Sequence, residues 1–400
     1  MADLDLTELA DWHNELREQF PIITAHPDVA YLDSAATSQK PRAVLDAVQR
    51  YLTTANANAG RGSYPWANHT TALVERTRQR VKEFLRDPEP ERSGVHFTSG
   101  TTEGLRNIAR DWLPGHLTDG DEILVPFADH RANLDPWLEA RRLLAEQGVT
   151  VHLRELPYQE SSGDYDHRAL AEVVGPRTRF VAATHVHHVY GGDMNVHRIR
   201  EAVGPDVPIC LDAAQSIGHL PVSVNRLDVD FVVFSGHKAL ALPGSGAVWA
   251  RNAPGRGGEF WPGGWSGTPN TVGIASLEAA LDWLDAAGTE RIARWTTALG
   301  ARLTEGLRRL ASYEILGCQT SLGAGSTVQR RHGIVTIRHC EIPSDDLGFI
   351  LHSHGLMVRA DNLCQAGTDK RDGSVRISLH VHNTAQEIDR LLTVLATLEG

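Results

Sequence analysis

The chain has 400 residues, of which 41% are hydrophobic and 22% charged, and its formal net charge is −11. This composition is typical of a globular protein with an ample core, and the length predicts one large and one smaller domain. The acidic balance argues against nucleic acid and anionic membrane surfaces as partners. No apolar run is long enough to span a bilayer, and the acidic start lacks a targeting pattern, so we expect a cytoplasmic protein.

The first half of the chain alternates strand-like and helix-like patterns. Residues 4–20 predict an amphipathic helix, and seven later apolar runs predict strands. These runs cover residues 94–98, 122–126, 149–153, 179–184, 208–212, 231–234 and 246–250. Their alternation with helical patterns indicates an α/β fold with a mostly parallel sheet, whose ligands bind beyond the carboxyl ends of the strands.

The pattern changes near the C-terminus. A long helical stretch over 274–310 is followed by expected strands at 333–338, 355–360 and 374–380, and by a terminal helix from Thr384 onward. This pattern predicts a small α+β domain. We expect the N-terminal segment 1–28 to join that small domain (291–400), and residues 29–290 to form the large domain.

The four cysteines and twenty histidines predict no metal site. Cys210, Cys318, Cys340 and Cys364 are scattered without a C-x-x-C pair, so neither zinc nor a disulfide framework is indicated. The run Thr184-His-Val-His-His188 is rich in histidine, but its side chains alternate along a strand and no carboxylate or cysteine cluster joins them.

Two strand ends carry the residues with the clearest chemistry. Asp212 ends one apolar run, and Lys238 follows the next one in Phe234-Ser-Gly-His-Lys, so both are expected at neighbouring strand ends. A lysine that forms a Schiff base and a carboxylate that keeps a pyridine nitrogen protonated are what pyridoxal phosphate (PLP) requires. The alternative is a surface lysine beside an ordinary strand-end aspartate.

Two further segments bear on this choice. Thr98-Ser-Gly-Thr-Thr-Glu-Gly104 precedes an expected helix over 105–113, where small residues would surround a phosphate at the helix start. An ordinary helix cap with Glu103 is the alternative, but Ser235 and His237 beside Lys238 favour the phosphate site. His130 follows the strand at 122–126, where an imidazole can stack on a pyridine ring and relay protons.

The ordered set of motifs resembles a family. It comprises Tyr31-Leu-Asp-Ser-Ala-Ala, Gly100-Thr-Thr-Glu-Gly, His130-Arg-Ala-Asn, Asp212-Ala-Ala-Gln-Ser, Ser235-Gly-His-Lys, Gly267-Thr-Pro-Asn-Thr, Arg359 with Cys364, and Val375-Arg-Ile-Ser-Leu-His. The chain is similar nearly end to end to fold-type I, class V PLP enzymes. Within that class it resembles the group II cysteine desulfurases and selenocysteine lyases.

The resemblance implies a role for each matched residue. Lys238 would hold the cofactor and move the substrate α-proton, Asp212 would pair with the pyridinium nitrogen, Gln215 would contact the phenolic oxygen, and His130 would stack on the ring. The residues implied to hold the phosphate are Thr101, Thr102, Ser235 and His237, joined by Thr268 from the other subunit of a homodimer. Those expected beside the substrate are Arg376, which would bind its carboxylate, together with Arg359 and Ala36.

Cys364 discriminates between the possible reactions. It lies in a polar segment between two expected strands, whereas Cys210 lies inside an apolar run. A thiol in such a loop can reach a ligand and react as a thiolate. In the family this cysteine takes sulfur from the substrate as a persulfide and leaves alanine. A bystander loop thiol is the alternative.

The chain departs from the family pattern on the substrate side. It has Ala360-Asp-Asn-Leu363 where the family usually has Thr-Gly-His-His, and Gly60-Arg61-Gly62 followed by Tyr64 where a histidine commonly flanks the Arg-Gly pair. It has His188 where an asparagine usually meets the phenolic oxygen of the cofactor. The cofactor side matches the family, and the substrate side differs.

We therefore expect a PLP-dependent cysteine desulfurase that acts on L-cysteine or selenocysteine and passes its persulfide to an acceptor protein for iron–sulfur or thio-cofactor synthesis. The alternative within PLP chemistry is a carbon–sulfur lyase or aminotransferase acting on a cysteine derivative, with Cys364 dispensable. A non-catalytic scaffold is the alternative outside it, and the joint presence of the lysine, the aspartate and the phosphate-binding residues argues against that reading.

Overall fold

A seven-stranded sheet dominates the computed structural model, which describes residues 6–60, 62–159, 164–251, 268–317, 331–364 and 373–399. Its order is β2-β10-β9-β8-β7-β3-β4. The bounds are β2 Gly94–Thr98, β3 Glu122–Val125, β4 His152–Glu155, β7 Thr178–Thr184, β8 Ile209–Asp212, β9 Phe231–Ser235 and β10 Gly246–Ala250. Only β10 runs antiparallel to its neighbours within this sheet. The expected mostly parallel α/β sheet is confirmed.

Both faces of this sheet are buried, which explains why its strands are apolar throughout. Alternate residues of β9 belong to different apolar clusters: Val232 and Phe234 to one, Phe231 and Val233 to the other. Helices with apolar faces complete each cluster. The first cluster includes residues of α3 (Arg42–Thr54), α4 (Pro65–Phe84), α7 (His167–Val173), α8 (Val196–Val203), α9 (Val224–Leu227) and α10 (Thr271–Ala287); the second includes those of α5 (Thr101–Asn107) and α6 (Asp135–Glu146).

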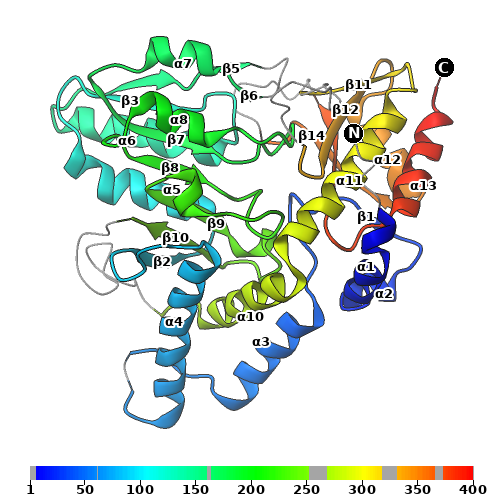
Figure 1. The fold of residues 1–400 in the computed structure, drawn as a ribbon, viewed down its shortest axis with the longest axis horizontal. Helices are drawn as coiled ribbons and strands as arrows, with labels where there is room; N and C mark the ends of the chain where they lie inside the picture. Colours follow the sequence, from blue (N-terminus) through cyan, green and yellow to red (C-terminus); the bar gives the residue numbers. More distant parts are fainter. Residues whose placement is uncertain are drawn as a thin grey trace.

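A second, four-stranded sheet lies at the other end of the molecule (Figure 1). Its order is β11-β12-β15-β14, with all pairs antiparallel. The strands are β11 Tyr313–Ile315, β12 Ile334–His339, β14 Arg359–Asp361 and β15 Ser374–Ser378, and the helices around them are α11 Thr289–Leu307, α12 Ser344–Ser353 and α13 Ala385–Ala396. Helix α11 runs between the two halves of the molecule (Figure 1).

The N-terminal segment contacts both halves. It forms a 3-10 turn at Leu6–Leu9 and helices α1 (Ala10–Arg17) and α2 (Pro21–Ala25). Leu9 belongs to the apolar core of the smaller sheet, whereas Leu16 belongs to that of the larger one. The domain boundaries drawn from the sequence therefore stay a prediction, since this segment is shared.

Two short pairings complete the fold. Strand β1 (Ala30–Tyr31) pairs in parallel with β13 (Leu356–Met357), and β5 (Tyr158–Gln159) pairs with β6 (Asp164–Tyr165). The first pairing brings the segment that follows β1 against the smaller sheet, because Asp33 forms a parallel bridge with Ser378. This contact places Asp33 beside the substrate-side residues described below.

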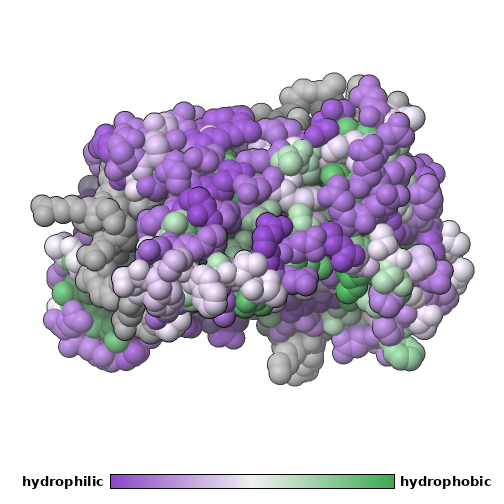
Figure 2. All heavy atoms as spheres, turned by 90° about the horizontal axis from the view of Figure 1, so that it is seen from below, coloured by the Kyte–Doolittle hydropathy of each residue, from purple (hydrophilic) through white to green (hydrophobic). Residues whose placement is uncertain are grey.

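The surface is mostly hydrophilic on the face shown in Figure 2, where apolar side chains form small separate groups. Large apolar side chains that are exposed include Leu45 and Leu52 on α3 and Trp66 on α4. Among the described helices, none combines the length and the apolar character that a membrane span requires.

Candidate functional site

Lys238 and Asp212 lie at adjacent strand ends of the larger sheet. Asp212 is the last residue of β8, and Lys238 ends the 3-10 turn Gly236–Lys238 that follows the neighbouring parallel strand β9. Burial raises the pKa of Asp212 to about 7 and lowers that of Lys238 to about 8, while the Coulombic attraction between the two opposes both shifts. Close to neutral pH both groups are thus ready to exchange a proton or to bind an opposite charge.

Gln215, three residues after Asp212, has one buried polar atom without a partner among the described residues. Its Nε2 donates to the backbone oxygen of Ala35 at 3.0 Å, which fixes the amide plane. Its Oε1 is buried and has no hydrogen-bond partner among the described residues. Because a buried amide oxygen normally has a donor, Gln215 offers an unused acceptor to a ligand at this position. Ala36 is the next residue along the chain and is half-buried.

The segment expected to bind phosphate joins two strand ends. The hydroxyl of Ser235 accepts from the backbone N–H of Thr101 at 2.9 Å and lies 2.8 Å from Thr101 Oγ1. Gly100 has φ +155°, and a Cβ there would meet Ser235 Oγ at 3.0 Å, so only glycine fits without displacement. Thr102 is exposed and His237 is half-buried. Helix α5 begins at Thr101, four residues earlier than expected, and a capping contact is also present because Glu103 Oε2 accepts from Ser99 N at 2.5 Å.

His130 and His188 form one wall of the site. Their rings meet edge to face with centroids 5.0 Å apart. Burial lowers the pKa of His130 to about 3 and that of His188 to about 4, so both rings are neutral. The Nε2 of His188 lies 3.1 Å from the carbonyl oxygen of Leu363, and its Nδ1 lies 3.3 Å from Asp129 Oδ1. Both ring nitrogens face protein groups, so a role for His188 toward a cofactor stays a prediction.

Asp129, His187 and His188 are close enough together to be considered as metal ligands. The hydrogen bonds of His187 argue against this, because its Nδ1 accepts from Val189 N at 3.2 Å and from Tyr190 N at 3.3 Å. The proton is then on Nε2, which faces the carbonyl oxygen of Ala128 at 3.4 Å, so no lone pair is left for a metal ion.

The substrate-side residues come from the smaller sheet. Arg376 on β15 and Arg359 on β14 are directly paired across the sheet. Arg376 is almost fully buried; its Nη2 donates to Asp33 Oδ1 at 3.1 Å and its Nη1 to the carbonyl oxygen of His188 at 3.2 Å. Its Nε is buried without a partner among the described residues. Arg376 thus keeps donor capacity for a carboxylate.

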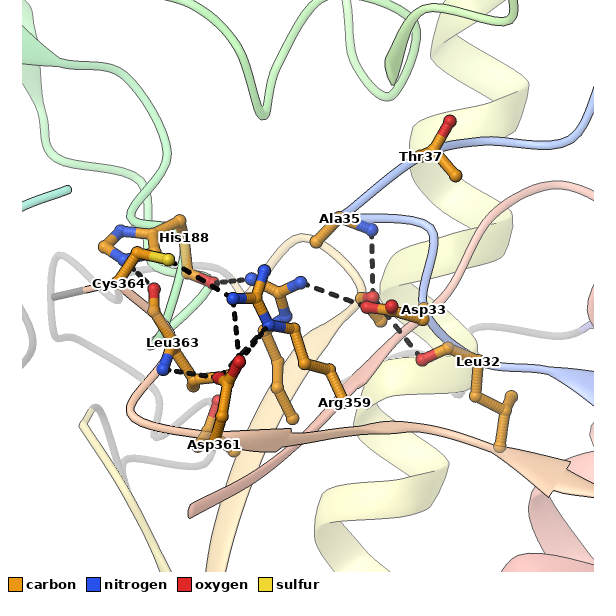
Figure 3. A network of polar contacts seen from close by, with 12 residues as sticks. Leu32, Asp33, Ala35, Thr37, His188, Arg359, Asp361, Leu363 and Cys364 are labelled. Atoms are coloured by element: carbon orange, nitrogen blue, oxygen red, sulfur yellow. Dashed lines mark hydrogen bonds and ion pairs between the residues drawn. The ribbon is translucent and has the colours of Figure 1, made fainter. Parts of the chain in front are cut away.

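Cys364 lies beside Arg359, as Figure 3 shows. Arg359 Nη2 is 3.3 Å from Cys364 Sγ, and the same guanidinium forms an ion pair with Asp361 at 2.8 Å. The backbone oxygen of Cys364 accepts from Arg131 N at 3.3 Å, next to His130. These contacts bring the thiol to the wall formed by the two histidines. Residues 365–372, which follow Cys364, lie outside the described part of the chain.

For the remaining residues singled out in the sequence, the structure describes only their exposure or leaves them outside the described part of the chain. Thr268 precedes α10 and is exposed, whereas Gly267 lies outside the described residues. Tyr64 is exposed directly before α4, Gly60 is described, and Arg61 is not. Cys318 also lies outside the described residues, so its environment stays open.

Sequence reasoning gave no role to two residues that the structure brings into the site, Asp33 and Asp361. Asp361 is two residues after Arg359 in an extended strand, and such residues point to the same face. That spacing was a usable signal for their ion pair. Asp33 had no comparable signal, because its contact with Arg376 spans nearly the whole chain.

Comparisons with known proteins agree on one family. The profile of the class-V aminotransferases matches residues 30–391. A cysteine desulfurase of Cronobacter sakazakii is 32% identical over 95% of this chain and 97% of its own length, and a probable cysteine desulfurase of Vibrio cholerae is 31% identical over 95% and 96%. Among solved structures, the apo cysteine desulfurase of Thermococcus onnurineus has a TM-score of 0.83 at 26% identity, covering 96% of this chain and 98% of its own. The Escherichia coli cysteine desulfurase CsdA in its S-sulfonic acid form has a TM-score of 0.80 at 27% identity, with the same coverage of both chains.

Proposed function

Because the chain belongs to the class-V aminotransferase family, we propose that it is a PLP-dependent cysteine desulfurase that converts L-cysteine to alanine and retains the sulfur on Cys364. The relatives support the activity, and one observation carries its assignment to this thiol. Cys364 Sγ lies against Arg359, the cross-strand neighbour of the buried Arg376. Both arginines are close enough to affect the pKa of Lys238.

The residues present fit PLP on three structural grounds. Asp212 is a buried carboxyl whose pKa is raised to about 7. A pyridinium nitrogen beside it would lower this pKa again, because its positive charge stabilises the carboxylate. Gln215 Oε1 is buried and lacks a partner in the described part of the protein. The glycine at position 100 leaves space beside Ser235 Oγ that a Cβ would fill. PLP bound here would supply an electron sink for the bonds at the substrate α-carbon.

Lys238 acts in this proposal as the covalent anchor and as the base at the α-carbon. Burial lowers its pKa to about 8, so a substantial fraction of the amine is neutral near physiological pH. Asp212 holds the opposite charge on the adjacent strand. The pair therefore combines a nucleophilic amine with a carboxylate on the adjacent strand.

Arg376 is proposed to bind the substrate carboxylate. Its Nε has no partner among the described groups, and Asp33 and the carbonyl of His188 hold the guanidinium plane in place. A planar guanidinium can donate two parallel hydrogen bonds to the two oxygens of a carboxylate, which would orient the α-carbon relative to Lys238. Ala36 and Arg359 remain the proposed neighbours of the bound amino acid.

The sulfur step uses the Cys364 thiolate as nucleophile. Its Sγ forms a bond to the substrate sulfur, the carbon–sulfur bond breaks, and its electron pair goes to the substrate β-carbon. Protonation of that carbon gives alanine, and Cys364 carries the persulfide, so cysteine and one thiol are converted to alanine and one persulfide without an external oxidant. An acceptor thiol would then collect the sulfur.

We propose a homodimer in which Thr268 completes the phosphate site of the neighbouring subunit. Thr268 is exposed within its own chain, which leaves its hydroxyl available to another molecule. The exposed apolar side chains of Leu52 on α3 and Trp66 on α4 supply surface suitable for such an interface.

The test replaces Cys364 by serine and identifies the carbon product. Native protein supplied with L-cysteine should form alanine and a persulfide on the Cys364 peptide, detected by mass spectrometry. Cys364→Ser should lose activity on cysteine but keep much of it on selenocysteine, because a selenolate leaves without help from a protein thiol. Its visible cofactor absorbance should be unchanged.

Cys340→Ser is the matched control, because Cys340 is exposed, directly follows β12 and is not among the described hydrogen-bond partners of Arg359. It should retain native rates. Equal activity of Cys364→Ser on cysteine and selenocysteine, or pyruvate with ammonia as the product, would instead identify a carbon–sulfur lyase.

A further inference from the structure

Asp361 occupies the point where strand β14 gives way to the segment that carries Cys364. Its carboxylate faces two directions at once. Toward the strand, it accepts from Arg359 Nε at 3.1 Å through Oδ1 and at 3.0 Å through Oδ2, and Arg359 Nη2 lies 2.8 Å from Oδ2. Toward the cysteine, its Oδ1 accepts from Leu363 N at 2.6 Å. One side chain thus fixes both the guanidinium and the turn that leads to the thiol (Figure 3).

The turn itself needs such support. Leu363 and Cys364 have φ of +55° and +58°, in the left-handed region that non-glycine residues seldom adopt. The Leu363 N–H bond to Asp361 and a bond from Cys364 N to Asn362 Oδ1 at 3.3 Å stabilise this backbone. Aspartate and asparagine are suited to the task because their short side chains bond to the backbone two residues on.

The position of the Cys364 backbone is also fixed from the other side. Leu363 is 1% exposed and packs with Val189, Tyr190 and Leu316. Its carbonyl oxygen bonds to His188, and that of Cys364 bonds to Arg131 N. The backbone before and at Cys364 is thus held by several contacts, whereas the sulfur has a single hydrogen-bond partner among the described residues, Arg359 Nη2.

Arg359 can donate to the sulfur of Cys364 only if its guanidinium plane is held in one orientation. The guanidinium is half-buried, and burial alone would lower the pKa of Arg359. Its hydrogen bonds to Asp361 and Cys364 outweigh this effect and raise the pKa. With Nε and Nη2 both bound by Asp361, the plane has one orientation, and in it Nη2 also faces Cys364 Sγ. A guanidinium held in this way stabilises a thiolate at the sulfur and fixes where its lone pairs point.

We propose that Asp361 is a positioning residue that acts through Arg359 to hold the Cys364 thiolate in the orientation needed to attack the substrate sulfur. The inference rests on the proposed desulfurase reaction and adds a determinant of its sulfur step. Asp361 touches neither substrate nor reacting sulfur, since its two oxygens are used by Arg359 and by Leu363 N. Its effect therefore depends on Arg359 being present.

The experiment is a double-mutant cycle with Asp361→Asn and Arg359→Gln, read by alkylation of Cys364 with iodoacetamide at fixed pH. Asparagine keeps the oxygen that accepts from Leu363 N, so the turn should persist. Asp361→Asn should slow alkylation severalfold, to the rate of Arg359→Gln, and the double variant should be no slower than either single one. Alkylation needs no substrate, so this readout stands whether or not the desulfurase assignment holds.

Turnover supplies the second readout. With cysteine as substrate, Asp361→Asn should lower kcat about tenfold to hundredfold while KM changes little, because a thiol displaced by about 1 Å costs that much and Arg376 still binds the carboxylate. Asp345→Asn is the matched control: Asp345 is exposed, lines the same surface hollow as Asp361 and is not among the described hydrogen-bond or ion-pair partners of Arg359. It should keep native rates.

Two outcomes would overturn the inference. If Asp361 acts only through its charge, Asp361→Asn should alkylate faster than the native protein, and should still do so when Arg359 is glutamine. A kcat equal to that of Asp345→Asn would likewise exclude a positioning role. The visible cofactor absorbance of each variant verifies that the fold and the Lys238 site are intact.

Discussion

The two sides of the site are stabilised by different physics. Lys238 and Asp212 stand at the ends of strands of one sheet, and burial is the largest cause of both their pKa shifts. Arg359, Asp361 and Cys364 lie in and after a three-residue strand of the smaller sheet, and direct contacts between charged and polar groups hold them. Burial sets the direction of the pKa shifts of Lys238 and Asp212, whereas at Arg359 and Asp361 their mutual hydrogen bonds outweigh the effect of burial. Substitutions on the two sides should therefore fail in different ways.

The largest effect is expected from Lys238→Ala, which removes the proposed covalent anchor and the proposed base together. Turnover of every amino-acid substrate should be abolished. Borohydride treatment of the native protein should fix the cofactor on the Lys238 peptide, where mass spectrometry would detect it. An adduct on a different lysine would show that the cofactor side has been assigned to the wrong residues.

Asp212→Ala should reduce kcat about hundredfold or more, because its carboxylate stabilises positive charge on the cofactor ring as the reaction proceeds. Binding of PLP should weaken much less, since the proposed phosphate contacts of Thr101 and Ser235 would remain. Steady-state kinetics with equilibrium dialysis of PLP would separate the two quantities. A near-native kcat would mean that another group faces the pyridine nitrogen.

Arg376→Lys tests the substrate side in the same way. Lysine keeps the charge but cannot present two parallel N–H donors, so the KM for cysteine should rise about tenfold to hundredfold. The cofactor absorbance should change little, because lysine keeps the positive charge that acts on Lys238. If kcat fell while KM for cysteine stayed at its native value, Arg376 would not act mainly by binding the substrate, and the proposed difference between the cofactor side and the substrate side would be wrong.

The smallest effect concerns pH. Burial, assisted by the charges of Arg376 and Arg359 and opposed by Asp212, lowers the pKa of Lys238 to about 8. Only the neutral amine attacks an aldehyde, so the rate of PLP attachment to the apoprotein should rise about tenfold between pH 7 and 9 and then level off. A lysine at its ordinary pKa would continue to gain rate above pH 9. Borohydride trapping at timed intervals measures this rate.

The sequence predicted most of the larger sheet because residues buried on both faces leave uninterrupted apolar runs. It was wrong about β4, expected at 149–153 and found at His152–Glu155, where exposed and polar side chains weaken the pattern. The expected strand at 355–360 is divided, because Leu356–Met357 pairs with β1 and Arg359–Asp361 pairs with β15. Such choices of pairing depend on distant segments and leave no local signal.

The residues of the site also fall into those that the local sequence pattern predicts and those that depend on pairing between distant segments. Lys238, Asp212 and Ser235 follow apolar strands, so their convergence could be inferred from strand order alone. Asp33 reaches Arg376 only because β1 joins the smaller sheet, and that contact spans 343 residues. Cys364 could be selected from its polar surroundings, which predict a loop thiol that can reach a ligand. The structure anchors the backbone at Cys364 through Leu363, His188 and Arg131.

The burial of Leu363 links sulfur chemistry to the relative motion of the two halves. Val189 and Tyr190 follow a strand of the larger sheet, whereas Leu316 and Leu363 follow strands of the smaller one. Rotation of one sheet away from the other would expose this leucine, at a cost of about 2 kcal/mol. Leu363 thus joins the segment that carries Cys364 to the half of the molecule that carries Lys238, and its burial opposes their separation.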